Sequence, residues 1–348
     1  MRIALPSMLP TAIGSLPHRD PVAAVAAVRR HLPACPVWPQ MPRRTWREQM
    51  SAQFSEGIPG MIDGEAGMRF DPEADQASAG SAILQLYLET PGAAMSIGRD
   101  RAAGLYALAE APPPAAPPVA VKGQITGPLT LGLSLTDPSG LPLLHREAVM
   151  DSLVKVLAMR ARWQERFLAR LSPRTIIFLD EPALSTYGSG FVAYDRGQVA
   201  GWLTEVLGAL EGLRGVHCCG STDWSFLMAR PVDIVSFDAW GFVEEVALHA
   251  SAIRGLLRRG GRLAWGIVPA AGEELARLTG GELADRLEAA IERVAAEGVD
   301  RGALLEQSLV TPSCGLASLD EDAATWAMEL TARVSAILRE RYDLEGEV

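Results

Sequence analysis

Short runs rich in apolar and β-branched residues recur along the last two thirds of the chain, each five to seven residues long. A Gly, Pro or Asp follows each run within two residues, which marks the end of an element. Runs of this kind are typical of strands that are buried on both faces, as in a parallel sheet. The predicted strands cover residues 120–125, 175–179, 215–219, 233–237, 262–268 and 305–310.

Between these runs, apolar residues return at helical spacing. The longest such segment covers residues 150–171, where Leu153, Val156 and Leu157 begin one apolar face. The alternation of strand and helix predicts a parallel β/α architecture, either a closed barrel or an open doubly wound sheet. The other predicted helices of this part of the chain cover residues 198–210, 242–258, 283–296 and 322–341.

The first third of the chain is less regular. We expect a short strand before Ile13, a helix over residues 22–31 and a second strand over residues 36–42. Residues 110–118 are rich in Ala and Pro, which favours an exposed connection rather than a domain boundary. The sequence contains no internal repeat, so we expect one domain over residues 1–348.

Composition and charge narrow the range of functions. The chain is 48% hydrophobic and 21% charged, as in an ordinary soluble globular protein, and its net charge is −10. So acidic a chain lacks the basic surface of a nucleic-acid binder and is repelled by anionic membranes. No stretch approaches the roughly 20 apolar residues of a spanning helix, and prolines interrupt the N-terminus where a signal peptide needs an apolar run. We therefore expect a cytoplasmic protein.

Chemically reactive side chains lie where the predicted strands end. They are Asp180, His217, Cys219, Asp238 and Cys314. In a β/α barrel the carboxyl ends of all strands converge on one face, where active sites are built. An open sheet also gathers some residues near its switch point, but a barrel gathers all of them more naturally. This placement therefore favours a single TIM (β/α)8 barrel with N-terminal extensions.

The His217-Cys218-Cys219 sequence suggests a metal site. Positions i and i+2 of a strand face the same way, so His217 and Cys219 can bind one ion while Cys218 points away. An isolated His-x-Cys more often packs in the core, but Cys314 at another strand end favours a metal. With Asp238 as an oxygen donor, the set suits tetrahedral zinc, Zn2+. Zinc held by two thiolates can keep an incoming thiol deprotonated, which suggests a thiol substrate.

Three further features suit the binding of a small polar substrate. Asp180 could bind an ammonium group, or could cap the segment that follows it. Glu65 has a similar ambiguity, because alone it would be a loop carboxylate. The Ile13-Gly14-Ser15 turn could offer backbone N–H groups to a carboxylate, or could be only a turn.

Together these residues resemble the catalytic domain of cobalamin-independent methionine synthase. More broadly, they are similar to the superfamily that it shares with uroporphyrinogen decarboxylase and the methylcobamide:thiol methyltransferases. The resemblance implies a TIM-type barrel, a catalytic zinc and methyl transfer to the sulfur of homocysteine, which forms methionine. The similar positions are residues 13–15, 63–65, 125–128, 180–184, 217–219, 233–238 and 313–316.

The resemblance also implies roles for single residues. His217, Cys219 and Cys314 would be zinc ligands, and Asp238 stands where the family has a zinc-binding Glu. Ile13, Gly14, Ser15, Glu65 and Asp180 would surround the amino-acid end of homocysteine, with Asp180 also acting in catalysis.

Two departures bear on the methyl donor. Residues 266–271 carry no histidine where the full-length synthase has one, and the chain has no room for the N-terminal barrel that helps to hold folate. We therefore expect the short, single-barrel branch of the family, with a methylated corrinoid, held by a partner protein, as donor.

Three other interpretations stay open. The acceptor could be another small thiol, similar to coenzyme M. The chain could be a metal-free decarboxylase on the same barrel, although that chemistry needs no thiolates. It could also be a catalytically silent barrel that binds a thiol or a corrinoid protein.

Overall fold

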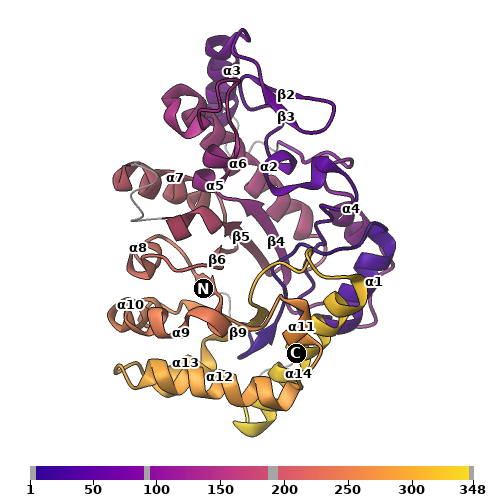
Figure 1. Cartoon of the computed structure of the whole chain (residues 1–348), viewed down its shortest axis with the longest axis vertical. Helices are drawn as coiled ribbons and strands as arrows, with labels where there is room; N and C mark the ends of the chain where they lie inside the picture. The colour runs from indigo at the N-terminus through magenta and orange to yellow at the C-terminus, as the bar shows by residue number, and fades with distance from the viewer. Residues whose placement is uncertain (1–4, 90–94, 187–194, 345–348) are drawn as a thin grey trace.

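A curled sheet of seven parallel strands forms the centre of the computed structural model, which describes residues 5–89, 95–186 and 195–344 (Figure 1). The strands are β1 (Leu9–Pro10), β4 (Val121–Thr126), β5 (Thr175–Asp180), β6 (Leu213–Cys218), β7 (Ile234–Phe237), β8 (Arg262–Val268) and β9 (Ser308–Pro312). Their order in the sheet is β1-β9-β8-β7-β6-β5-β4. Each neighbouring pair is parallel, as the alternation of strand and helix predicts.

Between the two edges of this sheet lies the segment that was predicted as a strand over residues 36–42. It makes two isolated parallel bridges, Val37 to Lys122 on one side and Gln40 to Ser15 on the other. It is extended but forms no regular strand, because Pro36, Pro39 and Pro42 lack the N–H groups of a continuous ladder. The architecture is consistent with a TIM-like barrel, and a regular eighth strand is not formed in the described part of the chain.

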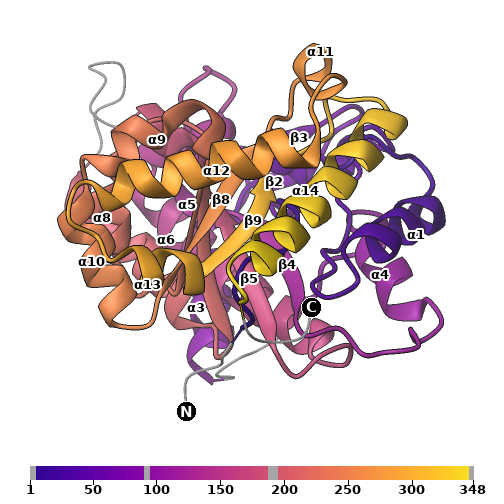
Figure 2. The same ribbon diagram turned by 90° about the horizontal axis from the view of Figure 1, so that it is seen from below.

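Helices follow most strands and cover the outside of the sheet. Figure 2 shows α12 (Gly280–Ala295) and α14 (Glu321–Arg341) lying against β8 and β9. The remaining helices along this part of the chain are α5 (Pro128–Ser134), α6 (Glu147–Leu168), α7 (Arg196–Gly208), α8 (Trp224–Met228), α9 (Ala239–Ala247), α10 (Ala250–Arg258), α11 (Gly272–Leu275) and α13 (Arg301–Glu306). No helix of the described ranges is both long and apolar enough to cross a bilayer.

Two sequence predictions of elements are wrong in their bounds. The single helix predicted over residues 242–258 is two helices, because α9 ends before the exposed Leu248 and α10 begins its own apolar face with Ile253. The strand predicted over residues 305–310 begins only at Ser308, because residues 305 and 306 belong to α13 (Arg301–Glu306), whose first turn Asp300 caps by accepting a hydrogen bond from the Ala303 N–H at 2.6 Å.

Apart from β1 and the segment at residues 36–42, the residues before β4 form an extension beside the sheet. Helix α1 (Pro21–His31) packs on α4 (Ala103–Glu110) and α14. The upper part of Figure 1 shows a two-stranded hairpin near α3. The hairpin is formed by β2 (Met61–Asp63) and β3 (Met68–Phe70), and it lies in the chain between α2 (Met50–Gln53) and α3 (Gln76–Glu89).

The inside of the curled sheet is apolar at the end where the strands begin. Ile176 and Phe178 of β5, Ile234 of β7 and Leu309 of β9 are fully buried and belong to one cluster. Gly215 of β6 makes room for the ring of Phe178, since a Cβ atom there would lie 2.0 Å from the ring. Because side chains alternate along a strand, the next inward positions carry the polar residues that are described below.

Candidate functional site

The carboxyl ends of the strands surround a cavity of about 580 Å³. Asp180 is the last residue of β5, His217 lies on β6 and Cys219 follows it directly. Cys314 lies two residues after β9 and completes this side of the cavity. The strand-end rule therefore led to four residues that line one cavity.

His217, Cys219 and Cys314 form a compact group. One ring nitrogen of His217 and the two Sγ atoms all lie within 4.8 Å of one another. His217 Nδ1 lies 2.9 Å from the Ser236 hydroxyl on β7, which fixes the orientation of the ring. His217 Nε2 is buried and has no hydrogen-bond partner among the described residues. A buried nitrogen of this kind beside two sulfur atoms fits a metal ligand, and the donor set is one that zinc favours.

The two thiols are electrostatically unequal. The Cys314 thiol and the His217 ring beside it lower the pKa of Cys219, whereas the contact with Cys219 and burial raise the pKa of Cys314. Cys218 points away, and burial raises the pKa of its thiol to about 12. The structure separates the neighbouring cysteines as the strand geometry predicts, since Cys219 belongs to the compact group and Cys218 does not.

Asp238 follows β7 and lies near this group without joining it. Its Oδ1 accepts a hydrogen bond from the Gly241 N–H at 2.8 Å and caps α9. Burial raises the pKa of its carboxyl group, and the charges of Cys219 and His217 act on it weakly. Its carboxylate is not among the ligand atoms that lie within 4.8 Å of one another in the described structure, so its role as a ligand stays a prediction.

Asp180 presents a carboxylate to the cavity. Its Oδ1 is buried and makes no hydrogen bond to any described residue. Burial raises its pKa to about 6, and the positive charge of Lys122 opposes this shift. A buried carboxylate oxygen without a partner is suited to an ammonium group.

The Ile13-Gly14-Ser15 turn follows β1, which forms the edge of the sheet opposite to β4. Ile13 and Ser15 line the cavity. Gly14 has a φ of +147°, and a Cβ atom there would lie 2.4 Å from the Gln124 side chain, so the turn requires glycine. Gly14 O accepts a hydrogen bond from the Gln40 N–H at 3.0 Å. The N–H groups of Gly14 and Ser15 donate to no group that the structure describes, and of the two residues Ser15 lines the cavity.

Glu65 lies apart from these residues. It is exposed in the turn between β2 and β3 and is not among the residues that line the cavity.

Glu48 is a lining residue that the sequence analysis did not find. It is buried, accepts hydrogen bonds from the Met41 N–H at 3.1 Å and from Arg44 Nη1 at 2.7 Å, and burial raises its pKa. Glu48 ends a short 3₁₀ helix, so a search of strand ends does not reach it.

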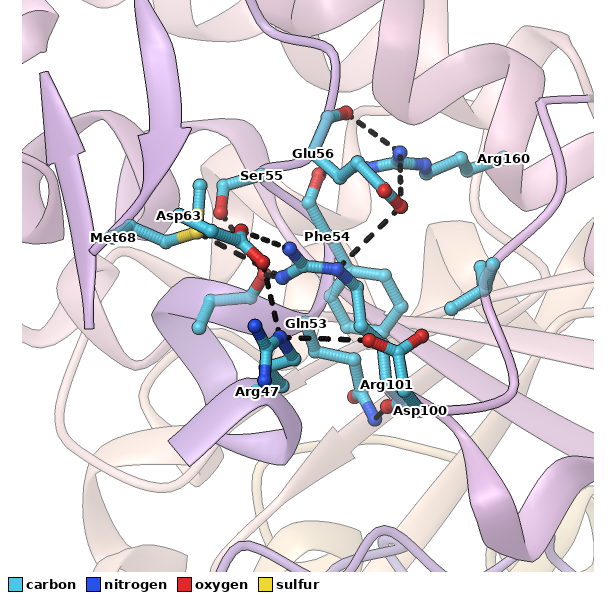
Figure 3. Close-up of polar contacts among 12 residues, drawn as sticks. Arg47, Gln53, Phe54, Ser55, Glu56, Asp63, Met68, Asp100, Arg101 and Arg160 are labelled. Atoms are coloured by element: carbon cyan, nitrogen blue, oxygen red, sulfur yellow. Dashed lines mark hydrogen bonds and ion pairs between the residues drawn. The ribbon is translucent and has the colours of Figure 1, made fainter. Parts of the chain in front are cut away.

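A network of charged side chains fastens the segment that carries Glu48 to the β2–β3 hairpin (Figure 3). Arg101 is 2% exposed, pairs with Asp63 and donates a hydrogen bond to Ala52 O at 2.9 Å. Arg47 Nε, next to Glu48, lies 3.0 Å from the other oxygen of Asp63. The Asp63 carboxylate of the hairpin therefore binds both Arg101 and Arg47, the neighbour of the cavity-lining Glu48.

Comparison with known proteins identifies the fold. No protein-family model matches the chain, and no curated protein matches it. A solved structure of a B12-independent methionine synthase from Shewanella sp. W3-18-1, in complex with selenomethionine, is similar over 96% of this chain and 98% of that chain, with a TM-score of 0.58 and 15% identity. A B12-independent methionine synthase described as putative, from Listeria monocytogenes, is similar over 94% and 86% of the two chains, with a TM-score of 0.55 and 14% identity. A methyltransferase from Methanosarcina mazei is similar over 95% and 94%, with a TM-score of 0.56 and 14% identity. At these identities the chain shares the fold of these proteins.

Proposed function

We propose that this protein is a zinc-dependent methyltransferase that transfers a methyl group to the thiol of homocysteine and forms methionine. The observation that carries the proposal is the convergence of His217, Cys219 and Cys314, whose ligand atoms lie within 4.8 Å of one another beside the cavity. Imidazole and two thiolates suit zinc and leave a coordination position for a substrate. Zinc held there would keep the acceptor thiol deprotonated at neutral pH.

The residues around the cavity offer partners for the other end of homocysteine. Asp180 would bind the substrate ammonium with its unpartnered oxygen. The N–H groups of Gly14 and Ser15 would bind the substrate carboxylate, since adjacent backbone N–H groups form anion sites. Met50 and Pro182 line the same cavity and add apolar surface to it.

The donor that we propose is a methylated corrinoid, carried by a partner protein. Residues 266–271, at and after the end of β8, contain no histidine that could donate a proton to a folate leaving group. A corrinoid leaves as a reduced cobalt species and needs no such proton. This part of the proposal rests on the lack of a proton-donating histidine in residues 266–271.

The first experiment measures zinc per chain by elemental analysis, in protein purified under reducing conditions. We expect about one zinc in the wild type and little in Cys219→Ser. Cys218→Ser is the matched control, because that thiol points away from the group and should not affect zinc content. A wild type that takes up no zinc on reconstitution would remove the mechanism.

Turnover then separates the remaining functions. Zinc-loaded protein is incubated with methylcobalamin or methyl-folate as donor, and with homocysteine or a small thiol without an amino-acid end as acceptor. Methylation of homocysteine from methylcobalamin supports the proposal. The position of Glu65 outside the cavity lining favours a simpler thiol as the second candidate, and methylation of that thiol alone would establish it. Zinc uptake without any turnover would indicate a binding protein.

A further inference from the structure

Lys122 is a charged side chain buried inside the curled sheet. The chain has two lysines, and Lys122 is 0% exposed, whereas Lys155 lies on α6 and pairs with Asp151. Lys122 Nζ donates a hydrogen bond to Ile13 O at 2.6 Å and lies 3.5 Å from Gln124 Oε1. It also lies 4.3 Å from the centre of the Phe178 ring. A short bond to a backbone carbonyl is thus its strongest contact.

This ammonium has no carboxylate within ion-pair distance among the described residues. The opposite charge that acts on it most is Asp180, two positions beyond Phe178 on the same face of β5. Burial lowers the pKa of Lys122 to about 8, so the group is charged at neutral pH. Because an isolated buried charge costs free energy, stability alone does not account for a lysine at this position.

The location of the charge suggests its use. Ile13 O, which accepts from Lys122, belongs to the same turn as the Gly14 and Ser15 N–H groups, which donate to none of the described residues. This bond fixes the Ile13 carbonyl, and Ser15 of the same turn lines the cavity. Asp180, Ile13 and Ser15 all line the cavity. A positive charge beneath the turn and a negative charge at Asp180 are complementary to a zwitterion.

We propose that Lys122 is a positioning residue that selects a zwitterionic α-amino acid as the thiol substrate. Its ammonium holds the Ile13 carbonyl and thereby the turn, and it adds positive potential where the substrate carboxylate binds. The carboxylate end of the substrate therefore depends on Lys122, whereas the thiol and the ammonium depend on other residues. This inference rests on the proposed function, because it concerns the acceptor of that reaction.

The experiment compares three thiols by titration calorimetry on zinc-loaded wild type and Lys122→Met. Homocysteine carries both charged groups, 3-aminopropanethiol lacks the carboxylate, and 2-mercaptoethanol lacks both. We expect Lys122→Met to bind homocysteine at least about ten-fold more weakly, because the charged hydrogen bond that fixes the Ile13 carbonyl, and with it the turn, is lost. Binding of the other two thiols and the zinc content should be unchanged. Lys155→Met is the matched control and should leave all three affinities unchanged.

The results distinguish the role of Lys122 from the proposed methyl transfer to homocysteine. Equal loss of all three thiols, or no loss of homocysteine, would overturn the role of Lys122 and leave the proposed function intact. A wild type that binds 2-mercaptoethanol as tightly as homocysteine would overturn the amino-acid acceptor, and the role of Lys122 with it. If Lys122→Met does not fold, Lys122→Gln, which is also neutral, is judged by the same comparison.

Discussion

Two arginines that share one carboxylate allow a direct test of how burial sets the strength of an ion pair. Arg101 is 2% exposed and Arg47 is 36% exposed, and both pair with Asp63 (Figure 3). Arg101 also donates a hydrogen bond to Ala52 O at 2.9 Å, whereas Arg47 lies 3.5 Å from the exposed Asp100. The substitutions Arg101→Met and Arg47→Met remove each guanidinium and keep most of its apolar stem.

The expected costs differ severalfold. For Arg101, a hydrogen bond to a charged partner contributes about 1.5 to 3 kcal/mol and the bond to the Ala52 carbonyl about 1 kcal/mol. Some of this loss is offset because a buried charge is removed, so we expect Arg101→Met to lower the free energy of unfolding by about 2 to 3 kcal/mol. Arg47→Met should cost less than about 1 kcal/mol, as exposed pairs do.

Equilibrium unfolding in urea measures both values, with the slope of the transition checked to be unchanged. Asp63→Asn provides the second arm, because in that background Arg101→Met should cost distinctly less than it does in the wild type. Equal costs of Arg101→Met and Arg47→Met, or costs that Asp63→Asn leaves unchanged, would refute the reasoning from burial.

Three further predictions concern the interior and the thiols. Gly215→Ala should lower the free energy of unfolding by about 1 to 3 kcal/mol in urea, because its Cβ would overlap the Phe178 ring. Burial raises the pKa of Glu181 from 4.5 to about 7, so its protonated form stabilises the fold fully below about pH 4.5, and this contribution is lost as the pH rises through 7. The loss is about 3 kcal/mol, and Glu181→Gln should reduce the fall in unfolding free energy over that interval by a similar amount. At neutral pH, mass spectrometry after brief alkylation of metal-free protein should find Cys219 modified before the buried Cys35, whose pKa is raised to about 11.

The sheet could largely be predicted from the sequence. Apolar runs located β4 to β8 within two residues, because strands buried on both faces have little freedom in composition. The segment at residues 36–42 and the start of β9 were less predictable. In each case a local feature, three prolines or the Asp300 cap, decides the backbone conformation, and the hydrophobic pattern does not record it.

Strand-end reasoning was sufficient for the residues that a strand delivers to the cavity. It located Asp180, His217, Cys219 and Cys314, which the structure brings to one cavity. It missed Glu48, which an irregular segment brings to the wall, since only tertiary structure decides where such a segment lies.

Lys122 was missed for another reason. Its strand was interpreted as a continuous apolar run, although Lys122, Gln124 and Thr126 alternate with other residues along it. In an open sheet this alternation would indicate a solvated face, but all three residues are buried here. Inside a closed or nearly closed sheet, the same pattern marks a column of polar side chains that leads to the functional face.

The Phe178 ring connects the stability of this fold to its chemistry. The ring belongs to the apolar layer inside the sheet, and it lies 4.3 Å from the Lys122 ammonium and two positions before Asp180. A buried apolar ring packed against the ammonium keeps water from it, so the fields of Lys122 and of the nearby Asp180 extend further than they would in solvent. A smaller residue at this position would admit water and screen both charges. The packing of the apolar layer therefore sets the electrostatic character of the cavity floor as well as the stability of the sheet.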